Sequence, residues 1–271
     1  MISSAEGFGR ITPLIRTLIL FIVALRPCAS ARGQVKSPAQ LNQQKAEELL
    51  NSKKYSFQDL LNGKPGAVAN AKEIFALSDD PNTKLRAGSV LLRIGRGDQV
   101  QFDYLTAEAR KSLDYANSMP WPTLYDKDGN IVPEKPNPEF LKWCEAHKLN
   151  AWDTYEAAYY QVPVSWYFLA AAGDPRAYDL LTYGLHSKNV MIVGRAAEGL
   201  ARLQASQAVD EIIAAGSRAP LETRSSIGQA LLCFPDAKAQ AAADELIKDK
   251  KVLALWRAEA KSKGTKAFFP Y

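Results

Sequence analysis

The sequence predicts an all-α protein, an α-solenoid of antiparallel helix pairs interrupted by an irregular, aromatic-rich insertion. Two observations predict the solenoid: a nine-residue motif recurs at an offset of 29 residues, and a stretch with helical apolar spacing precedes each copy. A third predicts the insertion, because a segment rich in Pro, Asp and Lys separates the copies and contains several aromatic residues. We therefore expect five segments, at residues 1–31, 32–65, 66–116, 117–150 and 151–271.

The first segment has the layout of a secretory signal peptide. Arg10 and Arg16 form a short basic region, and a nine-residue apolar run follows at residues 17–25. Ala29 and Ala31 then place small residues at the positions that an exporting peptidase recognises. We expect cleavage after Ala31 and a periplasmic or secreted product.

The leader has two alternative interpretations, a membrane anchor and a lipidation site. A membrane anchor needs roughly 20 apolar residues, whereas the run at residues 17–25 has nine. Lipidation at Cys28 would require small residues before it, where the chain has Arg26 and Pro27. No transmembrane segment is expected after the leader is removed, because no other segment is long and apolar enough.

A linker and two helices are expected in the second segment. Residues 32–37 are interpreted as a flexible linker. A capping-box pattern at Ser37 predicts a helix that runs to about Ser52. Residues 56–61 form a second, shorter predicted helix.

The repeat motif consists of Arg, two small residues, any residue, Gly, any residue, Ala, any residue and Leu. The copy that begins at Arg195 is RAAEGLARL, and the copy that begins at Arg224 is RSSIGQALL. A third copy at Arg86 keeps the Arg, the small pair and the Arg-aliphatic ending, and residues 251–260 are a degenerate last member. Small residues let helices approach closely, so the motif predicts helix–helix contacts.

Each copy follows a stretch whose apolar residues recur at helical spacing. Asp-Pro pairs at residues 80–81 and 174–175 mark the turns, since Asp caps helix starts and Pro fits the first helical turn. The predicted unit is two antiparallel helices in about 30 residues. The stretches that precede the copies lie at residues 67–77, 175–185, 206–215 and 235–247.

These residues resemble HEAT repeats, in particular the short bacterial HEAT-like repeats of the phycobilisome-lyase type. The Gly-Asp-Pro-Arg-Ala opening at Gly173 and the second helix at Arg195 carry the resemblance, which covers about residues 66–112 and 173–262. It implies a stack of helix pairs that bury a common core. It also implies that the Arg opening each second helix is structural and pairs with an acidic or carbonyl group of the next unit.

The insertion at residues 117–150 contains a predicted hairpin and a predicted helix. Asp128-Gly129 lies between apolar residues, which favours a β-hairpin over residues 124–132. Asn137-Pro138 then begins a helix that contains Trp143 and Cys144. A longer helical stretch from Ala151 returns to the repeats, and Pro163 is expected to end or kink it.

The insertion also contains a sequence that resembles a calcium loop, Asp126-Lys-Asp-Gly-Asn130. An EF-hand requires Gly at its sixth position and Glu at its twelfth. Here Gly is fourth and the twelfth residue is Asn137. We therefore interpret the segment as a hairpin turn.

No catalytic or metal-binding constellation is evident, and no cofactor is expected. His147 and His186 lack the adjacent Glu residues with which iron-binding HEAT-repeat hydroxylases hold their metal. Asp153 and Glu156 have helical spacing, but solvated carboxylates are the simpler interpretation. The chain has no Gly-rich phosphate loop, G-x-S-x-G elbow or C-x-x-C pair.

Two cysteines follow the leader, Cys144 and Cys233. In an oxidising compartment they can form one disulfide, or each can be buried as a small apolar side chain. The sequence leaves both options open.

Aromatic crowding is the feature that most strongly indicates a binding site. Four of the five Trp residues lie within 46 residues of one another, and Trp and Tyr dominate binding hot spots. Aromatic residues also supply core area, and we expect that role in the apolar stretch that holds Tyr159, Tyr160 and Trp166. The candidate binding residues are Trp121, Tyr125, Trp143 and Trp152.

Charge excludes one class of partner and leaves the function broad. The chain has 34 Lys and Arg and 29 Asp and Glu, a net charge of +5 without a basic stripe, so nucleic acid is not expected. We expect an exported protein-binding or scaffold module with a protein partner, and not an enzyme. Two alternatives stay open: an enzyme or enzyme subunit related to HEAT-like bilin lyases, which is an analogy of fold, and a structural component of an envelope assembly.

Overall fold

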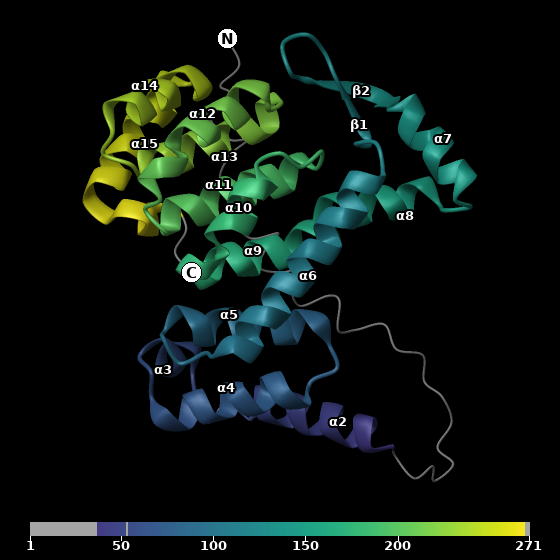
Figure 1. Ribbon diagram of the computed structural model, residues 1–271, viewed down its shortest axis with the longest axis vertical. Helices are drawn as coiled ribbons and strands as arrows, with labels where there is room; N and C mark the ends of the chain where they lie inside the picture. The colour runs from purple at the N-terminus through teal and green to yellow at the C-terminus, as the bar shows by residue number, and fades with distance from the viewer. Residues whose placement is uncertain (1–36, 53, 269–271) are drawn as a thin grey trace, which may run out of the picture. The chain divides into compact units, whose positions relative to one another are not determined.

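The computed structural model describes residues 37–52 and 54–268 (Figure 1). These residues are mostly helical and contain a single short hairpin, which confirms the expected all-α class. Among them, no helix is long and apolar enough to cross a membrane. The predicted leader and its cleavage site lie outside the described residues.

Three helices precede the first motif copy, as predicted. Ser56 caps α3 in a capping box with Asp59, which satisfies backbone amides at the helix start. Both α2 and α3 pack against α4. Their bounds are α2 (Pro38–Asn51), α3 (Phe57–Leu61) and α4 (Pro65–Leu77).

The repeat region consists of helices that pack against their sequence neighbours (Figure 1). Asp80 and Asn189 cap α5 and α11 with their side chains, as expected for turn residues before helices. Short 3-10 turns, Pro175–Ala177 and Ser206–Ala208, open α10 and α12. The bounds are α5 (Pro81–Arg93), α6 (Gln99–Ser118), α9 (Val162–Ala172), α10 (Tyr178–Gly184), α11 (Val190–Arg202), α12 (Val209–Arg218), α13 (Leu221–Leu232), α14 (Ala237–Leu246) and α15 (Lys250–Lys263).

The motif copies lie in α5, α11, α13 and, in degenerate form, α15, and α9, which carries no copy, joins α5 to α11 in a series of contacts. Helix α5 packs against α9, α9 against α11, and α11 against α13. The motif alanines Ala201 and Ala230, which lie 29 residues apart, are fully buried in one continuous core. The motif glycines also match: Gly199 lies against Leu181 of α10, and Gly228 lies against Ile247, which follows α14.

The motif arginines do not pair with the next unit, so that expectation is wrong. Arg195 donates from Nη1 to Glu198 in its own helix (2.8 Å) and lies over the Tyr167 ring of α9. Arg224 donates from Nε to the carbonyl of Ala219, just before its own helix (2.7 Å). In both cases the guanidinium stabilises packing next to its own helix.

The insertion lies inside a helix pair and not between two pairs. Helix α6 packs against α9 across the insertion, and the Trp166 indole donates to the carbonyl of Ala109 (2.9 Å). The chain thus leaves the pair at the end of α6 and returns at the start of α9. Between them lie β1 (Thr123–Tyr125), β2 (Ile131–Pro136), α7 (Pro138–Ala146), α8 (Ala151–Glu156) and a π-helical turn (Ala157–Gln161).

A small second core holds the insertion together. Its buried side chains are Met119, Phe140, Cys144 and Ala158. Cys233 belongs to the main core, and both thiols are free. The two cysteines therefore act as buried apolar side chains in separate clusters and form no disulfide.

Candidate functional site

The hairpin begins and ends at fixed backbone contacts. The Asn137 side chain donates to the carbonyl of Trp121 (2.8 Å), and its backbone amide donates to the carbonyl of Pro122 (2.9 Å). The predicted turn forms at the tip, where Asp126 accepts from the backbone amides of Asp128 (2.8 Å) and Asn130 (2.9 Å). Asp126 therefore acts as a turn residue, as expected.

The tip of the hairpin docks on the start of α13. The backbone amide of Leu221 donates to the carbonyl of Gly129 (2.9 Å). Gly129 has a φ of 84°, and a Cβ placed there would lie 3.3 Å from the Leu221 nitrogen. Glycine is thus required both for the left-handed backbone and for the close approach.

Four side chains form a hydrogen-bonded brace between the hairpin and the helices. Tyr125 accepts from the Trp121 indole (2.7 Å) and donates to the Glu222 carboxylate of α13. The Tyr159 hydroxyl lies 3.4 Å from the same carboxylate oxygen and 2.5 Å from the Thr123 hydroxyl. We call Trp121, Tyr125, Tyr159 and Glu222 the brace.

Both brace tyrosines have raised pKa values. Burial raises the pKa of Tyr125 far above its ordinary value, and the hydrogen bond to Glu222 raises it further. Burial likewise raises the pKa of Tyr159 to about 12. At neutral pH both hydroxyls carry their protons and can donate to the Glu222 carboxylate.

An unbroken series of ring contacts extends from the brace to the solvent. Tyr159 contacts Trp121 (ring centroids 4.6 Å apart) and Tyr155 (4.7 Å), and Tyr155 stacks on Trp152 (5.7 Å). Tyr160 lies beside Tyr159 at 6.3 Å. The two outermost side chains are strongly exposed, Trp152 at 65% and Tyr160 at 61%. These five residues define what we call the aromatic surface.

The π-helical turn explains why Tyr160 faces the solvent. Pro163 has no amide proton and cannot donate into the preceding turn, and the Val162 amide instead bonds to the carbonyl of Ala157, five residues back. Such a turn contains one residue more than a regular helical turn and shifts the faces of the helix. The expectation that Tyr160 belongs to the core is therefore wrong, whereas Trp166, in the regular α9, is fully buried as expected.

The four candidate residues have different surroundings. Trp121 and Tyr125 are half-buried in the brace, and Trp152 is the exposed end of the aromatic surface. Trp143 is half-buried beside the small core, where its ring stacks on His147 at 4.2 Å. The structure thus brings Trp121, Tyr125 and Trp152 into one connected array and leaves Trp143 outside its ring contacts.

Four contributors to this array were not among the candidate residues: Tyr155, Tyr159, Tyr160 and Glu222. Tyr155 belongs to the aromatic crowding, which is a signal that the sequence does carry. Tyr159 and Tyr160 were expected in the core because they lie in an apolar helical stretch, whereas Tyr159 is half-buried and Tyr160 is exposed. Glu222 carries no signal at all, since it lies 97 residues from Tyr125 in the chain.

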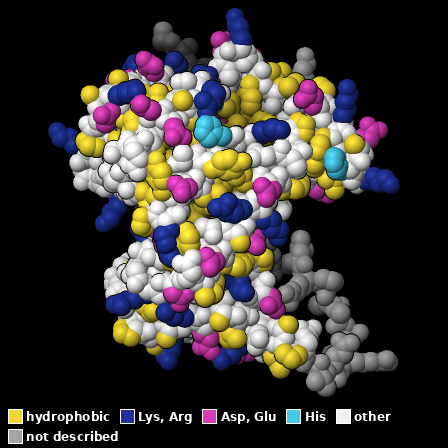
Figure 2. All heavy atoms as spheres, viewed as in Figure 1, with side chains coloured by type: hydrophobic (Ala, Val, Ile, Leu, Met, Phe, Trp, Pro, Cys, Tyr) yellow, Lys and Arg dark blue, Asp and Glu magenta, His cyan; other side chains and the backbone are white. Residues whose placement is uncertain are grey.

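The helical stretch at residues 149–173, which carries most of the aromatic surface, contains only negative charges. Residues 149–173 contain no Lys or Arg, and their only ionisable acids are Asp153 and Glu156, both exposed. Over the face shown in Figure 2, by contrast, cationic and anionic side chains are interspersed. The helical stretch that carries Trp152, Tyr155, Tyr159 and Tyr160 is therefore acidic, on a molecule of mixed charge.

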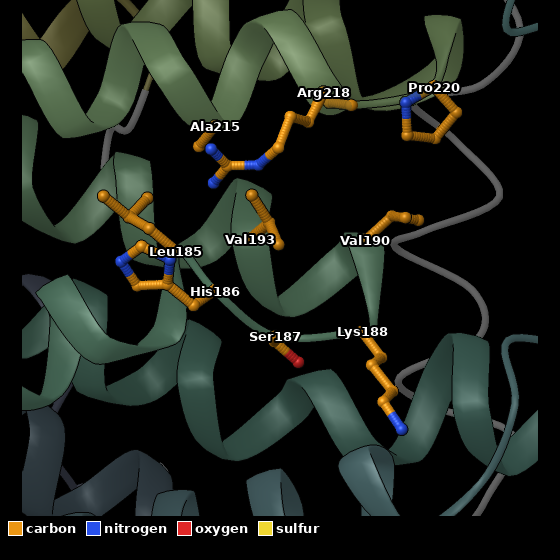
Figure 3. Close-up of a pocket in the computed structure, with 10 residues that line it drawn as sticks. Leu185, His186, Ser187, Lys188, Val190, Val193, Ala215, Arg218 and Pro220 are labelled. Carbon is orange, nitrogen blue, oxygen red and sulfur yellow. The ribbon is translucent and has the colours of Figure 1, made fainter.

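A pocket of about 290 Å³ lies between the α10–α11 loop and the end of α12. Figure 3 shows the Arg218 side chain extending over the pocket above Val193, with Lys188 directed away. The Lys188 ammonium donates to the carbonyl of Asn117 (3.2 Å), and His186 lies 3.6 Å from Glu211. Of the two cationic side chains of this pocket, Lys188 therefore already contacts another protein group.

Within the described part of the chain, no group of three or more His, Cys, Asp or Glu side chains is placed to hold a metal ion. Comparisons of the chain with known protein families, with curated proteins and with solved structures find no match.

Proposed function

We propose that this protein is an exported scaffold that binds a protein partner through its aromatic surface. The single observation that carries the proposal is the ring series ending in the exposed Trp152 and Tyr160. Large exposed aromatic side chains that are pre-ordered by neighbours lose little conformational freedom on binding, and they dominate interface energetics.

The scaffold in this proposal is a HEAT-like α-solenoid. The serial contacts of α5, α9, α11 and α13 support it, because stacked second helices are what the HEAT resemblance implies. The brace supports it further. Tyr125 lies in the hairpin that follows α6 in the sequence, and its hydroxyl donates to Glu222 of α13. A rigid scaffold that holds an irregular segment is a common arrangement for recognition.

The chemistry of the surface favours a basic partner segment. Asp153 and Glu156 are the only charged side chains among residues 149–173. Lys and Arg side chains gain both from carboxylates and from the faces of Trp and Tyr rings. We therefore propose that the partner presents Lys or Arg to Trp152 and its neighbours, and that a low ionic strength strengthens the complex.

The export part of the proposal rests on the leader sequence. We expect the mature chain to begin at Arg32. N-terminal sequencing of the exported protein tests this, and recovery of an uncleaved chain in the membrane fraction would contradict it.

Affinity capture with matched variants tests the binding surface. The bait is the mature protein, the source is the native envelope fraction, and the test variant carries Trp152→Ala with Tyr160→Ala. The control is Tyr183→Ala on α10, because Tyr183 is as exposed as Tyr160 (60%) but outside the ring series. We expect a partner that the wild type and the control retain and the double variant loses, at an unchanged thermal midpoint. A partner that all three proteins capture equally would refute the assignment of the surface.

A further inference from the structure

A second pocket, of about 500 Å³, lies between α3, the end of α5 and the C-terminal turn Gly264–Ala267. Residues far apart in the sequence line it, among them Asn62, Arg93, Arg96 and Lys266. It shares no residue with the aromatic surface. Its volume is in the range of pockets that hold small molecules, which is about 300–1,000 Å³.

The lining of this pocket is cationic. Arg93, Arg96 and Lys266 contribute three positive charges, and none of its described lining residues is acidic. The position of Arg93 has a structural reason. It lies in the last turn of α5, where a positive charge interacts favourably with the helix dipole. Arg96 follows that helix and Lys266 comes from the other end of the chain, so the dipole does not account for the cluster.

A further arginine lies near the pocket. Burial lowers the pKa of Arg93, and the nearby positive charge of Arg202 lowers it further. Arg202 is itself paired with the buried Glu198 carboxylate, so the charge that a ligand meets is that of the lining residues. A cluster of cationic side chains of this kind attracts an anion from solution.

Two features fix the geometry of the pocket. Phe268, next to the C-terminal turn, packs against Trp256 of α15 (ring centroids 6.0 Å apart), which holds the turn of Lys266 in place. On the opposite wall, Gln58 donates to the side-chain oxygen of Asn62 (3.0 Å). That bond uses the acceptor of Asn62 and leaves its NH₂ group to donate to a ligand.

We propose that this pocket binds a small polyanion, a compound with several phosphate or carboxylate groups. Arg93, Arg96 and Lys266 supply the charge, and Asn62 supplies a directed donor. Arginine forks match phosphate and carboxylate oxygens in pairs, and lysine adds a point charge. The inference is independent of the aromatic surface and holds whether or not that surface binds a partner.

Calorimetric titration of the mature protein tests the proposal with two probes, inorganic tripolyphosphate and citrate. The test variant carries Arg96→Gln with Lys266→Gln, and both residues are exposed, so folding is expected to persist. The control carries Lys72→Gln with Lys111→Gln, which removes two exposed charges far from the lining residues.

We expect saturable binding of at least one probe to the wild type and the control, weakened at least about tenfold in the test variant. Preference for tripolyphosphate would identify phosphate as the natural group, and preference for citrate would identify carboxylate. The proposal is overturned if neither probe binds saturably, or if the control variant loses as much affinity as the test variant. Circular dichroism of both variants confirms that the fold is retained.

Discussion

The two glycines of α11 offer a direct test of how the motif packs. A Cβ at Gly199 would lie 2.7 and 2.9 Å from the methyl groups of Leu181 and 3.2 Å from the Cβ of Ala170. Both neighbours are buried in the main core and have little room to move. A Cβ at Gly194, five residues earlier in the same helix, would make only ordinary contacts, the nearest at 3.5 Å to Thr223.

The expected magnitudes follow from two opposing effects. Replacing Gly by Ala inside a helix gains up to about 1 kcal/mol of intrinsic propensity. Overpacking a closed core costs about 1–3 kcal/mol. We therefore expect Gly199→Ala to lower the free energy of unfolding by about 1–2 kcal/mol, whereas Gly194→Ala raises it by up to about 1 kcal/mol.

Urea denaturation of the two variants measures this difference, with the thermal midpoint as a second readout. For a chain of this size each kcal/mol shifts the midpoint by about 2–4 °C. Gly228→Ala serves as the repeat equivalent, because its Cβ would lie 2.6 Å from Ile247. The reasoning is refuted if Gly199→Ala is as stable as Gly194→Ala, or if Gly228→Ala behaves like Gly194→Ala.

Three further predictions concern stability. Leu200→Ala and Leu231→Ala should each cost about 2–5 kcal/mol in urea denaturation, whereas Leu255→Ala on the exposed side of α15 should cost little; equal losses at all three sites would contradict the burial of the first two side chains. Glu198→Gln should cost about 3 kcal/mol, because it removes a buried carboxylate that binds two arginines; a loss below about 1 kcal/mol would show that the ion pairs contribute little. Burial raises the pKa of Tyr159 from 10.0 to about 12, so its neutral hydroxyl stabilises the fold fully below pH 10, and this contribution is lost as the pH rises toward 12. In alkaline urea titrations Tyr159→Phe should therefore lose less stability over that interval than the wild type, and parallel curves would contradict the role of this residue.

The local structure of this chain could be predicted from its sequence to a large extent. The spacing of apolar residues and the capping residues indicated the repeat helices and the short α3, and Asp128-Gly129 indicated the hairpin. The 29-residue register of the motif agrees with the burial, since its alanines Ala201 and Ala230 are both fully buried. These features depend on contacts within a few turns of the chain, so neighbouring residues are sufficient to encode them.

The candidate site could be predicted only in part. Aromatic crowding indicated the region, and Trp121, Tyr125 and Trp152 do belong to one array. Tyr160, which also belongs to the aromatic surface, lies in the π-helical turn before Pro163 and is exposed. A backbone irregularity of one residue changes every side-chain direction after it, and apolar spacing alone does not reveal it.

Tertiary structure alone decided how distant segments meet. The insertion interrupts the α6–α9 pair. The Glu222 carboxylate accepts a hydrogen bond from the Tyr125 hydroxyl, although the two residues are far apart in the sequence. Lys266 and Arg93 line the same pocket. The sequence by itself determined where the helices, the turns and their apolar faces lie. An apolar pattern specifies that a face must be covered, but not which face covers it, and the hydrogen bonds and charge clusters form only after that packing is complete.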